Sequence, residues 1–134
     1  MLTTDLIIIG AGPGGYETAL LAARRGLSVA LIERGEVGGT CLNEGCIPTK
    51  ALCRTAAMVS DFAEAEAFGI KDVAFTLDFP AVMERKRAVV KQLRDGVESL
   101  ISNPNIHLLR GEARFVDALT VEAAGERVTA KDVI

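Results

Sequence analysis

Short apolar runs and one helix-forming segment alternate over the first third of the chain. Residues 5–9 and 28–32 are nearly continuous β-branched and aliphatic runs, the pattern of strands buried on both faces of a parallel sheet. Between them, residues 16–25 are helix formers with an apolar side, and Gly26 stands just past the expected helix end. The pattern therefore predicts one βαβ unit with a right-handed crossover.

Two longer helices are predicted in the middle of the chain. Pro48 opens the first, which covers residues 49–68. The second begins at Asp78, and its apolar residues recur every three or four positions over roughly six turns, until the Asn103-Pro-Asn105 break. We expect the side chains of this apolar stripe to be buried in the core.

Four short strands are predicted after the second long helix, at residues 106–109, 113–116, 119–122 and 127–129. The whole pattern predicts an α/β fold, with a Rossmann-like parallel sheet, a long helical excursion and a small antiparallel β-meander. Residues 128–134 are again strand material and stop without a polar tail. We therefore expect the chain to be a piece of something longer.

Composition and charge narrow the class of protein. The 134 residues are 49% apolar and 25% charged, which suits a folded domain with a core and excludes a disordered tail. The formal net charge is -3 without a basic stripe, which argues against nucleic acid as a partner. No apolar run is long enough to span a bilayer and no signal peptide is recognised, so we expect a cytoplasmic protein without a membrane segment.

A glycine-rich loop joins the first strand to the first helix. Gly10, Gly12 and Gly15 form G-x-G-x-x-G in the strand–loop–helix context of a dinucleotide site, where helix N–H groups bind the pyrophosphate. Glu33 closes the second strand, where a carboxylate can accept hydrogen bonds from ribose hydroxyls and would repel a 2′-phosphate, which argues against NADP at this site. The alternative is a glycine-rich turn without a ligand. The motif does not separate NAD from FAD, because both present the same ADP half.

Two of the three cysteines, Cys41 and Cys46, are separated by four residues that include Gly45. A tight turn of this length can bring two sulfurs within bonding distance. The alternatives are two unpaired buried cysteines or half of a zinc site, and zinc is poorly supported because no second cysteine pair follows and the only histidine, His107, is far along the chain. A thiolate here would be stabilised by a helix N-terminus and by Lys50, so the spacing favours redox activity.

These segments resemble a known family. Gly10-Ala-Gly-Pro-Gly-Gly-Tyr16, Glu33 and Gly38-Gly-Thr-Cys-Leu-Asn-Glu-Gly-Cys-Ile-Pro-Thr-Lys50 are similar to the N-terminal flavin domain of the pyridine nucleotide-disulfide oxidoreductases. The cysteine motif is highly specific to that family, and the resemblance covers the whole chain. It implies that residues 1–134 are the N-terminal part of an incomplete FAD-binding domain, and that the NAD and interface domains are absent from this chain.

The resemblance also implies roles for individual residues. FAD would be the dinucleotide, with its ribose held by Glu33. Cys41 would be the interchange thiol that attacks the substrate disulfide, Cys46 would face the flavin as the charge-transfer thiolate, and Lys50 would lie beside the flavin ring. The implied cofactor contacts are Gly10, Gly12, Pro13, Gly14, Gly15, Glu33, Arg34, Gly39, Thr40, Cys41, Cys46, Lys50 and Ala113.

The implied reaction passes electrons from a dihydrolipoyl group to the Cys41–Cys46 disulfide, then to FAD and then to NAD. Leu42 and Ile47 favour the lipoamide enzymes over glutathione and mercuric reductases, whereas Glu44 stands where many members have valine and adds charge beside the disulfide. The implied partners are a lipoyl-bearing or other disulfide substrate, a second subunit in a homodimer, and a 2-oxo acid dehydrogenase complex. The alternatives are a glutathione- or mercuric-reductase-like enzyme and a non-catalytic dinucleotide-binding fragment.

Two further residues are interpreted as structural. Cys53 lies two turns beyond Cys46 on the same predicted helix, and we expect a small buried hydrophobe there rather than a third redox thiol. His107 precedes a strand and matches no motif of the family, so we expect a structural or solvent-facing side chain. No metal site is expected.

Overall fold

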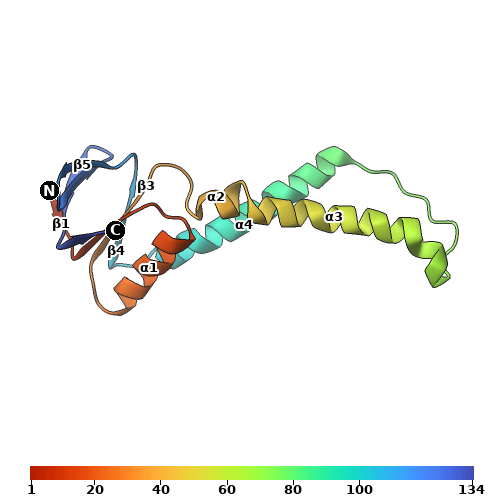
Figure 1. Cartoon of the computed structure of the whole chain (residues 1–134), viewed down its shortest axis with the longest axis horizontal. Helices are drawn as coiled ribbons and strands as arrows, with labels where there is room; N and C mark the ends of the chain where they lie inside the picture. The colour runs from red at the N-terminus through yellow and green to blue at the C-terminus, as the bar shows by residue number, and fades with distance from the viewer.

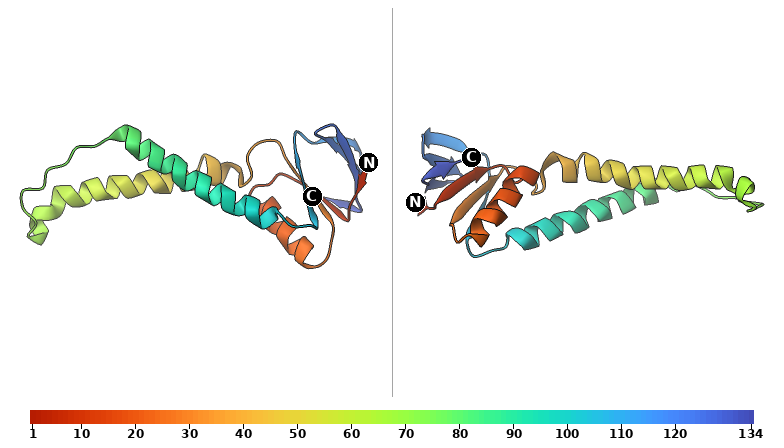
Figure 2. Two further views of the ribbon diagram at one scale, coloured as in Figure 1. Left: turned by 180° about the vertical axis from the view of Figure 1, so that it is seen from behind. Right: turned by 60° about the horizontal axis from the view of Figure 1, so that its bottom comes forward.

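The computed structural model describes residues 1–134 throughout (Figure 1). Two small sheets lie at one end of the molecule, where both termini are found, and two long helices extend from them as an arm (Figures 1 and 2). We call residues 46–101 the helical arm. The parallel sheet, the meander and the helical excursion that the sequence predicts are all present.

The parallel sheet has the strand order β4-β3-β2-β8. It contains β2 (Leu6–Ile9), β3 (Val29–Glu33), β4 (Ile106–Arg110) and β8 (Asp132–Val133), and every neighbouring pair is parallel. Helix α1 (Pro13–Arg24) makes the crossover from β2 to β3. The predicted βαβ unit is therefore confirmed, with its boundaries moved by one to three residues.

The second sheet is a meander extended by one short strand. β5 (Arg114–Asp117), β6 (Thr120–Ala123) and β7 (Glu126–Thr129) are antiparallel neighbours, as predicted. β1 (Leu2–Thr3) pairs with β7 in parallel and was not predicted. A strand of two residues is too short to show an alternating apolar pattern, so β1 is recognised only by its pairing with β7.

The core lies on both faces of the parallel sheet. Ile8, Val29 and Leu31 face one way and pack with the buried alanines of α1 and with Val90, Val97 and Ile101. Ile7, Ala30 and Ile32 alternate with them and pack against the meander through Val121 and Val128. Because successive strand side chains point to opposite faces, these apolar strands hold three layers together: helices, parallel sheet and meander.

Four helical segments follow β3. They are α2 (Gly39–Asn43), α3 (Cys46–Glu64), η1 (Ala65–Phe68) and α4 (Phe79–Ile101). The predicted first long helix is α3 plus η1, and Gly69 ends it at φ +78°. Asp78 caps α4 by accepting a hydrogen bond from the Ala81 N–H at 3.1 Å. Helix α2 was not predicted, because its segment was expected to be part of a tight turn.

Two expectations about the helical arm are wrong. The apolar stripe of α4 is buried at Val90, Val97 and Ile101, but Phe79 is 58% exposed and Leu100 is 54% exposed. Cys53, expected to be buried, is an exposed free cysteine on α3. Phe79 and Cys53 lie on the part of the helical arm that runs away from the sheets, where α3 and α4 pack mainly against each other, whereas Leu100 is next to the buried Ile101 on an exposed side of α4 (Figure 2). No helix of the structure has the length and apolar character needed to cross a membrane.

A polar cluster of Asp5, Ser28 and Lys131 joins the chain segments that precede β2, β3 and β8. One Asp5 oxygen lies 2.6 Å from Lys131 Nζ, and the other accepts hydrogen bonds from the Ser28 N–H at 2.9 Å and the Ser28 hydroxyl at 2.8 Å. The hydrogen bond from Lys131, followed by those from Ser28, holds the pKa of Asp5 well below its usual value. Asp5 in turn raises the pKa of Lys131.

Asp5→Asn is expected to destabilise the fold in a pH-dependent way. A pKa lowered by folding stabilises the protein above the unfolded-state pKa, and this contribution is lost as the pH falls through the folded-state pKa. The difference in urea midpoint between wild type and variant should therefore be full from about pH 5 upward and shrink towards about pH 2. Asp61→Asn, on an exposed and unpaired aspartate of α3, is the control. A difference that does not change with pH would contradict the assignment.

Candidate functional site

The glycine loop between β2 and α1 brings the helix directly over the end of the strand. Gly10 has φ +103°, and a Cβ added at Gly15 would collide with the carbonyl oxygen of Gly10. Gly12 is the N-cap of α1 and Pro13 occupies its first turn. The first N–H groups of the helix therefore face the loop without intrahelical partners, at the positive end of the helix dipole.

Both carboxylate oxygens of Glu33, the last residue of β3, accept backbone hydrogen bonds, one from the glycine loop and one from the chain just after β3. Oε2 accepts a hydrogen bond from the Ala11 N–H at 2.7 Å, and Oε1 accepts one from the Gly35 N–H at 2.8 Å. Each carboxylate oxygen keeps further acceptor capacity. Glu33 can therefore accept hydrogen bonds from a diol beside the loop while its own position stays fixed.

A cavity of 660 Å³ opens beside Glu33 at the ends of β2 and β3. The carboxyl ends of parallel strands are the usual place for a ligand in an open α/β sheet. Of the predicted cofactor residues, the cavity is lined by Gly10, Glu33, Arg34, Gly39, Thr40 and Ala113. The others predicted, which do not line it, are Gly12, Pro13, Gly14, Gly15, Cys41, Cys46 and Lys50.

The lining also contains residues that were not among the predicted cofactor contacts. They are Ile9, Ile32, Gly35, Glu36, Asn43, Glu44, Gly111 and Glu112. Gly111 donates its N–H to the carbonyl of Glu33 at 2.9 Å, and a Cβ on it would lie 2.9 Å from the Ala124 nitrogen. The lining therefore includes backbone that only a glycine can bring this close to the β6–β7 turn.

Helix α2 rests directly on the glycine loop. Gly38 donates its N–H to the carbonyl of Ala11 at 2.8 Å, and a Cβ added at Gly39 would lie 2.8 Å from Gly12 Cα. Both glycines have positive φ, +95° and +66°, so the chain enters the helix through a left-handed turn. The left-handed turn therefore favours glycine at both positions, and the close approach of α2 to the glycine loop leaves no room for a Cβ at Gly39.

Cys41 of α2 and Cys46 at the start of α3 form a disulfide, with their Cα atoms 4.8 Å apart. This agrees with the expected reach of the pair, and Cys53 is not part of it. Thr40, next to Cys41, lines the cavity together with Asn43 and Glu44, which lie between the two cysteines, whereas neither cysteine lines it. Lys50 lies one turn along α3 from Cys46 and is exposed.

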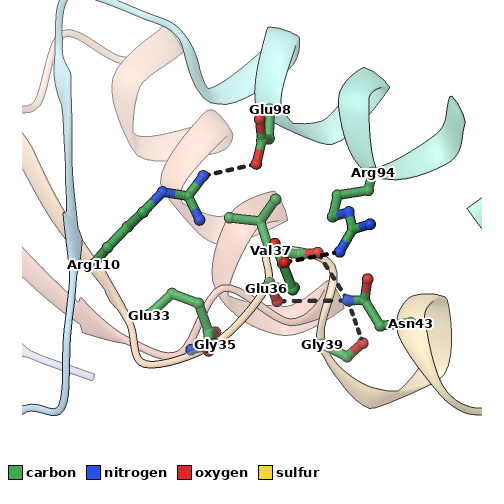
Figure 3. A network of polar contacts seen from close by, with 9 residues as sticks. All are labelled: Glu33, Gly35, Glu36, Val37, Gly39, Asn43, Arg94, Glu98 and Arg110. Carbon is green, nitrogen blue, oxygen red and sulfur yellow. Dashed lines mark hydrogen bonds and ion pairs between the residues drawn. The ribbon is translucent and has the colours of Figure 1, made fainter. Parts of the chain in front are cut away.

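Two ion pairs tie α4 to the cavity rim (Figure 3). Arg94 Nη1 lies 3.1 Å from a carboxylate oxygen of Glu36, and Arg110 Nη2 of β4 lies 2.7 Å from one of Glu98. Both pairs are partly exposed, so each is expected to contribute little stability by itself. Their effect is positional, since they fix the β3–α2 loop and the end of β4 relative to the same helix.

His107 lies away from this site. It is on β4, half-exposed, with Nε2 3.6 Å from a carboxylate oxygen of Glu126 on β7. It does not line the cavity. A structural or solvent-facing role, as expected from the sequence, agrees with this position.

The fold places a glycine loop at a helix N-terminus, with a carboxylate at the end of the next strand and a disulfide nearby. This arrangement is typical of dinucleotide-binding α/β proteins that carry a cysteine pair. The family model "Pyridine nucleotide-disulphide oxidoreductase" matches residues 4–134. The chain belongs to this family, and the resemblance stated from its motifs is confirmed.

Individual relatives agree with this assignment. The dihydrolipoyl dehydrogenase of Chlamydia muridarum is 46% identical over 122 residues, which are 91% of this chain and 26% of that protein. The dihydrolipoyl dehydrogenase of Thermus scotoductus is 46% identical over 134 residues, 100% of this chain and 29% of that protein. The solved Cu(II) complex of the HOCl-induced flavoprotein disulfide reductase RclA from Escherichia coli superposes with a TM-score of 0.78 at 30% identity, covering 99% of this chain and 28% of that one. The chain thus spans little more than a quarter of the length of these proteins.

Proposed function

We propose that residues 1–134 provide the FAD-binding and dithiol part of a flavin-dependent disulfide oxidoreductase of the dihydrolipoyl dehydrogenase kind. The reaction oxidises the two thiols of a dihydrolipoyl group to a disulfide and reduces NAD. One observation carries the proposal: Thr40, Asn43 and Glu44, which lie beside or between the disulfide-bonded Cys41 and Cys46, line the cavity next to the glycine loop. The identity to dihydrolipoyl dehydrogenases supports the choice of substrate.

FAD fits the residues on this side of the molecule. The free N–H groups at the start of α1 suit its pyrophosphate, and Glu33 suits the hydroxyls of its adenosine ribose. Arg34, Thr40 and Ala113 line the cavity in which the rest of the ADP half would lie. When bound, FAD supplies the two-electron carrier between the dithiol and NAD.

The cysteines carry the thiol–disulfide step. A substrate thiolate attacks Cys41 sulfur and forms a mixed disulfide, while Cys46 leaves as a thiolate. The second substrate thiol then displaces Cys41, so the substrate ends as a disulfide and the protein as a dithiol. Cys46 is the first residue of α3, where the positive end of the helix dipole favours its thiolate. We assign Lys50 to the flavin side of this pair.

The proposed complete assembly is a homodimer in the cytoplasm that acts on lipoyl groups of a 2-oxo acid dehydrogenase complex.

A second candidate function is that of a related reductase that acts on another disulfide. One observation favours it, because Glu44 puts a carboxylate in the redox turn and on the cavity wall. Reduction of the Cys41–Cys46 pair by dihydrolipoamide, compared with glutathione and a charged dithiol at equal concentration, discriminates the two.

The proposal is tested by titrating the purified chain with FAD and following the loss of flavin fluorescence. Thiols are counted before and after mild reduction in the same samples. We expect saturable binding of one flavin per chain and a disulfide that mild reduction opens. A chain that leaves FAD fluorescence unchanged at every concentration would contradict the flavin role.

Glu33→Ala should weaken FAD binding about ten- to a hundredfold, the effect of losing roughly 1.5–3 kcal/mol from a charge-assisted hydrogen bond. Glu36→Ala is the matched control, because Glu36 lines the same cavity but pairs with Arg94 instead of facing the glycine loop. The same fluorescence titration measures both variants. Equal affinities for the two would rule out the ribose role of Glu33.

A further inference from the structure

Asn43 lies inside the redox turn and makes an unusual set of contacts. It is the last residue of α2, between the two cysteines, and its Nδ2 donates to the carbonyl oxygens of Val37 at 3.0 Å and Gly39 at 2.9 Å (Figure 3). The carbonyl oxygen of Glu36 lies at 3.5 Å from the same nitrogen. The side-chain Oδ1 is buried without a partner. Three carbonyl acceptors around Nδ2 fix the orientation of this amide, so Asn43 acts as a donor only.

The segment that Asn43 holds is the one that touches the glycine loop. Gly38 donates to the carbonyl of Ala11, and Gly39 sits where any side chain would meet Gly12. Arg94 of α4 fixes the same segment from outside through Glu36. The amide of Asn43 therefore anchors the redox turn to a part of the molecule that is itself held by the β2–α1 loop and by α4.

Besides the burial of Leu42 in the core, two side-chain links hold α2 to its neighbours, and only one of these two links survives reduction. The disulfide joins α2 to the first residue of α3, while the Asn43 amide joins α2 to the β3–α2 loop. A helix of five residues does not keep its shape unaided, because its few backbone hydrogen bonds do not offset the ordering of the chain. When the disulfide opens, the amide of Asn43 is the side-chain hydrogen bond that still ties α2 to the β3–α2 loop, beside the packing of Leu42 in the core.

We propose that Asn43 is a positioning residue for the redox pair: it keeps Cys41 opposite Cys46 in the dithiol state and so favours closure of the disulfide. The inference rests on the proposed redox role of these cysteines. Without the amide, the reduced turn gains conformational freedom that closure must remove again. The oxidised turn gains less, because the disulfide still restrains it.

The equilibrium between the protein and glutathione tests this directly. The protein disulfide and two glutathione thiols give the protein dithiol and one glutathione disulfide, and the ratio is read by rapid alkylation and mass spectrometry at pH 7. Asn43→Ala should lower the equilibrium constant for disulfide formation about tenfold, the size of one net amide hydrogen bond, or about 30 mV for this two-electron couple. Asn43→Asp keeps the shape but removes the donor, and should shift the equilibrium in the same direction.

Asn103→Ala is the control, because Asn103 lies in the α4–β4 turn, where its side chain only accepts a hydrogen bond from the Asn105 N–H. The equilibrium constant of this variant should be unchanged. Amide exchange on the wild-type chain gives a measurement without any substitution. We expect the Glu44 N–H, which donates to the Thr40 carbonyl in α2, to stay protected after reduction. Loss of that protection would overturn the inference.

The outcomes separate the two proposals. A wild-type pair that no glutathione ratio reduces overturns the redox role, and the role of Asn43 with it. A wild-type pair that titrates normally, beside Asn43 variants with an unchanged constant, overturns the role of Asn43 alone. A shift in Asn43→Ala that Asn43→Asp does not share would show that lost volume, and not the lost donor, is the cause, which also overturns it.

Discussion

Gly39→Ala is expected to lower the affinity for FAD at least about a hundredfold, a loss of roughly 2.7 kcal/mol or more. Gly39 has φ +66°, a conformation that costs an alanine about 1–2 kcal/mol, and the new Cβ would lie 2.8 Å from Gly12 Cα. Since that atom belongs to the backbone of the glycine loop, no side-chain rotation relieves the contact. Either α2 or the loop must move, and the FAD fluorescence titration measures the consequence.

Gly96→Ala is the matched control for this substitution. Gly96 lies in the interior of α4 with open space around it and without a positive φ. Alanine there should raise the free energy of unfolding by about 0.5–1 kcal/mol, because glycine is a poor helix former, and should leave FAD binding unchanged. If Gly39→Ala bound FAD as tightly as Gly96→Ala, the close approach of α2 and the glycine loop would have no part in the site.

The elements predicted well are those whose pattern is carried within one segment. β2 and β3 are continuous apolar runs, which identifies strands buried on two faces, and the structure places core residues on both sides of them. Helix α2 has no such signal, because it contains five residues and begins at glycines in left-handed conformation. Its fold is decided by contact with the glycine loop, which no local pattern encodes.

The stripe of α4 shows the limit of periodicity in another way. A repeat of three and four residues identifies the apolar side of a helix but not what covers it. Val97 and Ile101 lie near the sheets and are buried, whereas Phe79, at the far end, is exposed. The arrangement of the helical arm, and not the sequence of α4, makes this difference.

The residues of the candidate site also fall into two groups, those that a sequence motif predicts and those that only the packing reveals. Gly10, Gly15, Glu33 and the cysteine pair belong to motifs with fixed spacing, and the structure brings them to one side of the molecule. Asn43 was part of the quoted motif, yet its contacts with the carbonyls of residues 37 and 39 follow from the left-handed turn before α2. Arg94 meets Glu36 across a long stretch of chain, so only the packing of α4 reveals the pair.

The 134-residue chain supplied with FAD, NAD and dihydrolipoamide is expected to give no steady formation of NADH. Oxidation of the dithiol needs a base of near-neutral pKa close to Cys41, and the single histidine, His107, is on β4 beside Glu126 instead. Hydride transfer needs a nicotinamide held against the flavin, and the one G-x-G-x-x-G loop would already bind the ADP half of FAD. Absorbance at the NADH band measures the result.

Thiol exchange with dihydrolipoamide should continue under the same conditions, because that step requires only an accessible cysteine pair. Alkylation followed by mass spectrometry should therefore find the Cys41–Cys46 disulfide opened in the wild-type chain, whereas Cys41→Ser has no disulfide to open. This contrast shows that the cysteine pair is reactive while turnover is absent. Steady NADH formation by the wild-type chain that disappears in Cys41→Ser would mean that these residues complete the reaction by themselves, and the division of labour implied by the family would be wrong.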